Sequence, residues 1–77
     1  MSTISLYPNP NNGAFTIDLK QILSGEVLVT NILGQLVEQL AFTETDKISL
    51  KLEAEAGVYF VSIQTPHGKA VRRLVIE

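Results

Sequence analysis

Hydrophobic and polar residues alternate with a period of two along much of the chain. The alternation is clearest in residues 14–19 and 46–52. Successive side chains of a β-strand point to opposite faces, so this pattern predicts strands with one buried face. Residues 27–29 and 58–63 are nearly continuous runs of apolar side chains, mostly β-branched or aromatic, which predicts strands in the centre of a sheet.

Turn-forming residues separate the predicted strands at regular intervals. The clusters are PNPNNG (8–13), SG (24–25), LGQ (33–35), TETD (43–46), EAEAG (53–57) and TPHG (65–68). They divide the chain into seven predicted strands, at 3–7, 14–19, 26–32, 35–42, 46–52, 58–65 and 69–76. A spacing of roughly 8–12 residues is typical of a small antiparallel sandwich. The sequence therefore predicts an all-β fold, a small seven-stranded antiparallel β-sandwich.

The TPHG turn, which ends at Gly68, predicts a hairpin between the strands 58–65 and 69–76. This hairpin places residues near Tyr59 opposite residues near Val75. A terminal strand paired in this way is an ordered part of the sheet.

Composition limits the class of protein. The chain has 77 residues, enough for one domain (1–77), and is 45% hydrophobic and 18% charged, which suits a folded core. The net charge of −2 argues against nucleic-acid binding. No amphipathic basic helix is predicted, and the longest apolar run is four residues, so direct membrane insertion is not expected. The opening MSTISLYP lacks signal-peptide features, and we expect the chain to be a piece of a longer protein.

The sequence offers little for catalysis. The one histidine, His67, is expected in a hairpin turn that faces water, where it has no partner to activate a nucleophile. The carboxylates that come in pairs lie in predicted loops or at strand ends: Glu44 with Asp46, and Glu53 with Glu55. General acid catalysis needs a carboxyl group in an apolar pocket, so no enzyme activity is predicted.

No cofactor or metal is predicted either. One histidine and no cysteine exclude the usual zinc ligand sets. Asn9, Asn11 and Asn12 offer oxygen atoms to calcium, but no carboxylate follows until Asp18. The chain has no glycine-rich phosphate-binding loop.

The cations Lys69, Arg72 and Arg73 are the one basic cluster. On a strand, Lys69 and Arg73 share a face with Val71, and Arg72 lies on the other face. Two interpretations stay open: charges that protect a sheet edge from aggregation, and a recognition patch for a partner.

Gly57 and Tyr59 open the strand 58–65. Gly57 is expected to supply a permissive backbone angle at the end of the loop. The ring of Tyr59 is expected in the core, with its hydroxyl group hydrogen-bonded.

Four segments together resemble a known family. In order and spacing, YPNPNNG, NILGQLV, GVYFV and the final GKAVRRLVIE are similar to the C-terminal sorting domain of type IX secretion cargo proteins from Bacteroidetes. The resemblance covers the chain from Ile4 to Glu77. It implies an Ig-like seven-stranded sandwich without catalytic activity or cofactor, which targets its cargo to the type IX translocon for outer-membrane export.

The resemblance also implies partners and a location. A sortase-like peptidase of the outer membrane commonly removes such domains as the cargo is attached to the cell surface. The cargo domain lies upstream in the full-length protein, which carries its own signal peptide. The protein is then in the periplasm in transit and afterwards secreted or on the cell surface.

The family's motifs fall on particular residues of this chain. Its PxPxxG pattern corresponds to Pro8, Pro10 and Gly13, and its glycine turn to Gly34. Its glycine-hydrophobic-tyrosine pattern falls on Gly57, Val58 and Tyr59, and its basic last strand on Lys69, Arg72 and Arg73. The family often ends in lysine, whereas this chain ends in Glu77.

Two roles are expected to be divided between the ends of the domain. Pro8 and Gly13 are expected to hold the first strand in place, and the surface that a partner contacts is expected on the last strand. The alternative function is an Ig-like spacer or adhesion module that binds carbohydrate or protein.

Overall fold

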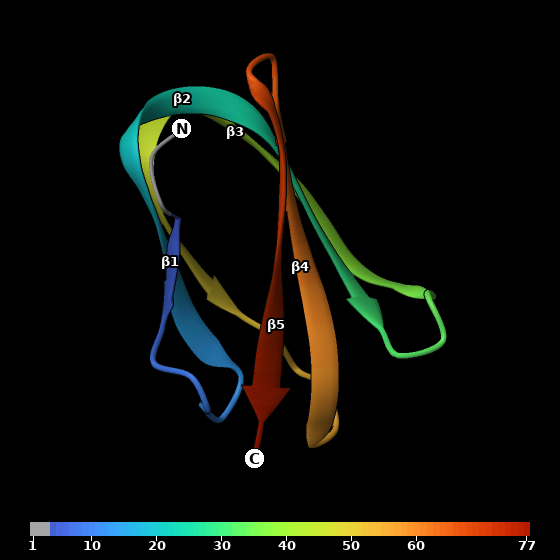
Figure 1. The fold of residues 1–77 in the computed structure, drawn as a ribbon. Helices are drawn as coiled ribbons and strands as arrows, with labels where there is room; N and C mark the ends of the chain where they lie inside the picture. The colour runs from blue at the N-terminus through green and yellow to red at the C-terminus, as the bar shows by residue number, and fades with distance from the viewer. Residues whose placement is uncertain (1–3) are drawn as a thin grey trace.

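The computed structural model describes residues 4–77, which fold into one curled antiparallel sheet (Figure 1). Within these residues the strands are β1 (Ser5–Tyr7), β2 (Ala14–Asn31), β3 (Leu36–Lys51), β4 (Gly57–Thr65) and β5 (Gly68–Ile76). The sheet has the order β1-β2-β4-β5, and β3 also pairs with β2. The all-β prediction is confirmed.

The number of strands differs from the prediction. The described chain has five strands rather than seven, in one curled sheet rather than the predicted sandwich. The predicted strands 14–19 and 26–32 are both parts of β2, and 35–42 and 46–52 are both parts of β3. Turn signals at 24–25 and 43–46 therefore bend the two strands without reversing the chain.

Both strands bend at the same place because they stay paired there. Their register shifts between Asp18 and Leu23 and again between Leu23 and Gly25. Lys20 in β2 and Glu44 in β3 have positive φ angles of 67° and 45°. Such irregularities increase the local bend of a strand, so β2 and β3 curl together and wrap the sheet around its core.

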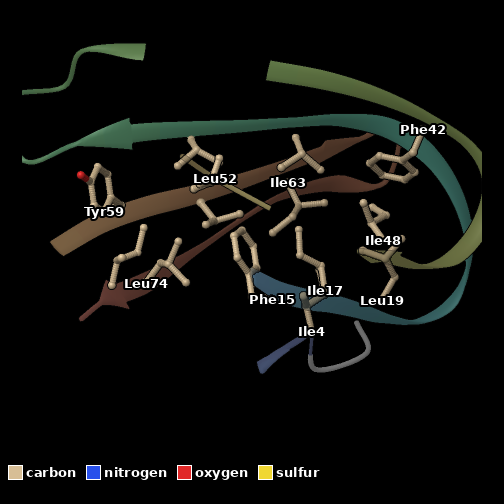
Figure 2. Close-up of a cluster of buried hydrophobic side chains, with 14 residues drawn as sticks. Ile4, Phe15, Ile17, Leu19, Phe42, Ile48, Leu52, Tyr59, Ile63 and Leu74 are labelled. Carbon is tan, nitrogen blue, oxygen red and sulfur yellow. The ribbon is translucent and has the colours of Figure 1, made fainter. Parts of the chain in front are cut away.

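The inner face of the curled sheet carries a single hydrophobic core. Figure 2 shows Phe42 at the bend and Tyr59 at the opposite end of this cluster. Its buried side chains are Ile4, Phe15, Ile17, Leu19, Val27, Val29, Phe42, Ile48, Leu52, Tyr59, Val61, Ile63, Leu74 and Ile76. Burying one such side chain is worth about 1.5–3 kcal/mol, so this cluster is the main source of stability.

The C-terminal hairpin forms as predicted. β4 and β5 pair over their full length, with Tyr59 opposite Leu74 and Val58 opposite Val75. Thr65 pairs with Gly68, which leaves Pro66 and His67 as the turn. β4 lies between β2 and β5, in agreement with its predicted central position.

Candidate functional site

The corner between β1 and β2 is fixed by the side chain of Asn11. This side chain is buried, donates from Nδ2 to the Pro8 carbonyl oxygen (2.8 Å) and accepts the Gly13 N–H at Oδ1 (2.8 Å). The peptide bonds that precede Pro8 and Pro10 are both cis. Gly13 has a φ of +110°, and a Cβ atom there would overlap the carbonyl oxygen of Leu52. The corner therefore requires glycine at this position.

The same corner closes the free edge of β5. Asn9 donates from Nδ2 to the Arg73 carbonyl oxygen (2.9 Å), and its Oδ1 accepts the Val75 N–H (3.0 Å). The Asn11 N–H then donates to the Val75 carbonyl oxygen (3.0 Å), and the Glu77 N–H donates to the Asn11 carbonyl oxygen (2.8 Å). The Asn9 amide thus bonds β5 as a peptide group of a neighbouring strand would. Covering an edge in this way prevents pairing with other chains.

Arg72 extends this closure toward the other end of β5. Its Nε donates to the Ile4 carbonyl oxygen (3.2 Å), and its Nη1 donates to the Val71 carbonyl oxygen (3.0 Å). The side chain is half-buried and joins β5 to the residue just before β1. These contacts favour a structural role for Arg72.

Lys69 and Arg73 lie on the outer face of the sheet. Both are exposed, as is Val71 between them. Arg73 is opposite the exposed Phe60 on β4. In residues 4–77 the one ion pair joins Lys20 to Asp18, so neither Lys69 nor Arg73 is neutralised by a carboxylate of the described chain. The three-residue cluster therefore separates into one structural arginine and two cations beside apolar side chains.

Tyr59 and the remaining motif glycines have structural surroundings. Tyr59 is buried, and its hydroxyl group donates to the Glu55 carbonyl oxygen (2.6 Å), as the sequence predicted. Gly57 and Gly68 open β4 and β5 with φ angles of +157° and +137°. Gly34 lies in the turn between β2 and β3.

The residues considered as candidates for catalysis lie on the surface. His67 is exposed in the hairpin turn, and its backbone N–H donates to Thr65 Oγ1 (3.1 Å). The four paired carboxylates are exposed as well. Within the described part of the chain, no three His, Cys, Asp or Glu side chains are grouped so that they could hold a metal ion. No helix in residues 4–77 is long and apolar enough to cross a membrane.

Comparisons with known proteins identify the family. The sequence matches the family described as secretion system C-terminal sorting domain over residues 5–77. The chain belongs to this family, which is the C-terminal sorting domain of type IX secretion. It is also 28% identical over 80 residues to the ulvan lyase NLR42 of Nonlabens ulvanivorans. That alignment covers 99% of this chain but only 14% of the lyase.

The family match indicates the general function of the domain. A domain of this family implies a C-terminal secretion signal on a secreted or cell-surface cargo protein. The family is non-catalytic. The lyase name describes a protein of which this domain's counterpart is a small part, so it gives this chain no activity of its own.

The sequence alone did not reveal the role of two asparagines. The sequence indicates Asn9 and Asn11 as turn residues and as possible oxygen ligands of a metal, whereas in the structure they also bond the edge of β5. A signal was present, because a side-chain amide carries the same donor and acceptor as a peptide group. Asn9 and β5 are far apart along the chain, so no local sequence pattern predicts that they are hydrogen-bonded.

Proposed function

We propose that this domain is the signal that targets a cargo protein to the type IX translocon for outer-membrane export and surface attachment. The observation that carries the proposal is the family match, which extends over residues 5–77. The cargo is then an upstream domain of the full-length protein, which crosses the periplasm in transit. A sortase-like peptidase of the outer membrane completes the set of proposed partners.

The fold suits recognition as a folded unit. Its last strand is held by β4 on one edge and by Asn9, Asn11 and Arg72 on the other. A surface that is already ordered loses little conformational entropy when a partner binds. Lys69 and Arg73 are the proposed recognition side chains on this strand, because they are exposed and lack a carboxylate partner in residues 4–77.

Fusion to a fluorescent reporter tests the proposal. The reporter receives a signal peptide at its N-terminus and this domain at its C-terminus, and is expressed in a type IX-competent bacterium. The expected result is fluorescence at the cell surface or in the medium. Fluorescence that stays in the periplasm contradicts the proposed function.

Replacing Lys69 and Arg73 by alanine tests their role. We expect export of the fusion to fall by about tenfold or more, as for loss of a binding hot spot. Lys47→Ala with Lys51→Ala is a matched control, because these exposed cations of β3 have the same spacing and their removal changes the net charge equally. Equal export of both double variants would show that Lys69 and Arg73 are only surface charges.

A further inference from the structure

The turn between β2 and β3 carries the most exposed large hydrophobic side chains of the described chain. Ile32 and Leu33 are 71% and 78% exposed, and Leu36 and Val37 beside them are exposed as well. These four belong to a group of nine such side chains in residues 4–77. Figure 1 shows the turn projecting from the sheet on the side away from β1. Single exposed hydrophobic residues are common, but a cluster of them marks an interaction site.

Asn31 holds this turn in one conformation. Its Oδ1 accepts the N–H groups of Leu33 (2.9 Å) and Gln35 (3.0 Å), and its Nδ2 donates to Gln35 Oε1 (2.9 Å). Its own N–H donates to the Gln35 carbonyl oxygen, and the Gly34 N–H donates to the Asn31 carbonyl oxygen, both at 3.0 Å.

Gly34 completes the turn for a conformational reason. It has a φ of +83°, and nothing lies within 4 Å of a Cβ atom built there. Glycine is therefore favoured by its backbone angle and not by lack of space. A turn fixed in this way presents its apolar side chains before a partner arrives, which lowers the entropic cost of binding.

The charges around the turn indicate the kind of partner. Residues 21–43, which include the turn and the parts of β2 and β3 between it and the bend, contain the acidic residues Glu26 and Glu38 and no lysine, arginine or histidine. Glu38 directly follows Val37 on β3, and Glu26 on β2 accepts a hydrogen bond from Gln39 Nε2 (2.7 Å). Carboxylates are repelled by anionic lipid headgroups, which instead attract basic segments. They complement a protein surface that carries cations around an apolar pocket.

The size of the patch argues against a second copy of the chain as the partner. A stable interface commonly buries about 800 Å² on each side, more than four side chains at one turn can supply. One or two large side chains can still dominate binding when they fill a pocket in a partner. The turn is therefore suited to insertion as a small anchor.

We propose that Ile32 and Leu33 insert into an apolar pocket with a basic rim on a protein of the export machinery. Glu38 faces that rim. The assignment of the pocket to the export machinery rests on the proposed function above. The site is distinct from Lys69 and Arg73, since it lies at the β2–β3 turn and β4 lies between β2 and β5.

The reporter fusion tests this inference with a matched control. Ile32→Ser with Leu33→Ser is expected to lower export by about tenfold or more, as for a binding hot spot. The midpoint of urea unfolding should stay unchanged, because both side chains are exposed. Ile22→Ser is the control, since Ile22 is 70% exposed but lies near the bend of β2. Glu38→Gln should lower export less, as loss of a charge at the rim of an interface does.

The outcomes separate the inference from the proposed function. A wild-type fusion that stays in the periplasm contradicts the proposed function, and the inference falls with it. A wild-type fusion that is exported together with an equally exported Ile32→Ser, Leu33→Ser variant contradicts the inference alone. Loss of export in the Ile22→Ser control to the same degree also contradicts it.

A photo-crosslinking amino acid at position 33 identifies the partner that binds the turn between β2 and β3. The expected result is a discrete protein adduct that is absent in cells without the translocon and absent when the crosslinker is at position 22. An adduct with a second copy of the fusion overturns the inference in favour of self-association. Co-sedimentation with phosphatidylethanolamine–phosphatidylglycerol vesicles that is lost in the double variant overturns it in favour of a membrane.

Discussion

At the scale of single residues, asparagine side chains in this domain form hydrogen bonds of the kind that backbone groups usually form. Asn9 supplies both a donor and an acceptor to β5, and Asn31 organises the turn between β2 and β3. Asparagine suits these positions because its short side chain carries both functions of a peptide group. Sequence patterns identified such residues as turn formers but did not identify their distant partners.

Asn9→Ala tests the bonding of β5 by a side chain. The substitution removes two hydrogen bonds, to the Arg73 carbonyl oxygen and from the Val75 N–H. We expect the free energy of unfolding to fall by about 1 kcal/mol, at the low end for two bonds because the site is exposed to water. Urea unfolding measures the change.

Asn12→Ala is the control for this substitution. Its exposed side chain makes one local bond, from the Ala14 N–H (3.3 Å), so its loss should cost less. An Asn9→Ala domain as stable as the wild type would show that water replaces the Asn9 amide at no cost.

At the scale of elements, periodicity identified the strand positions and the C-terminal hairpin. The alternation around Phe15 and Ile17 and the continuous run around Val61 report burial directly, so their sequence patterns were sufficient. The count of strands was wrong because turn residues at Gly25 and Glu44 produce bends as well as reversals. Whether neighbouring strands remain paired across a bend depends on contacts far along the chain.

The residues proposed for recognition could be predicted only in part. Alternation along β5 correctly separated Arg72 from Lys69 and Arg73, because the period of a strand is local. The bond from Arg72 to the Ile4 carbonyl oxygen joins opposite ends of the chain, and no local pattern reports it. The exposure of Ile32 and Leu33 was not predicted either, because the presence of apolar residues in the sequence does not show which of them lie outside the core.

The bend of β2 predicts a dependence of stability on pH. The Asp18 carboxylate accepts the backbone N–H of Lys20 (3.0 Å), and this bond lowers the pKa of Asp18 below its ordinary value of 3.8. A lowered pKa in the folded state stabilises the fold above pH 3.8, and the contribution is lost as the pH falls through the lowered value. Acidification should therefore destabilise the wild-type domain more than Asp18→Asn.

Urea unfolding between pH 6 and pH 2 checks this difference. Asn keeps an acceptor for the Lys20 N–H but does not titrate, so the stability of the variant should change less over this range. The other carboxylates titrate in both proteins and cancel in the comparison. Parallel curves for the two proteins would contradict the role assigned to the Asp18 charge.

At the scale of the whole molecule, the domain combines a closed sheet edge with two exposed features. Asn9, Asn11 and Arg72 bond the outer edge of β5, so recognition there by strand addition is disfavoured. The exposed features proposed for recognition are the pair Lys69 and Arg73 on the outer face and the apolar turn between β2 and β3. The proposed secretion signal is thus a set of side chains on a rigid support.

Dependence of export on the translocon tests the central claim most directly. The wild-type reporter fusion is expressed in a type IX-competent strain and in an otherwise identical strain without a functional translocon, and surface fluorescence is measured in both. We predict surface fluorescence in the competent strain and periplasmic retention in the other. Equal fluorescence at the two surfaces, or retention in both strains, would contradict the account of this domain as a type IX secretion signal.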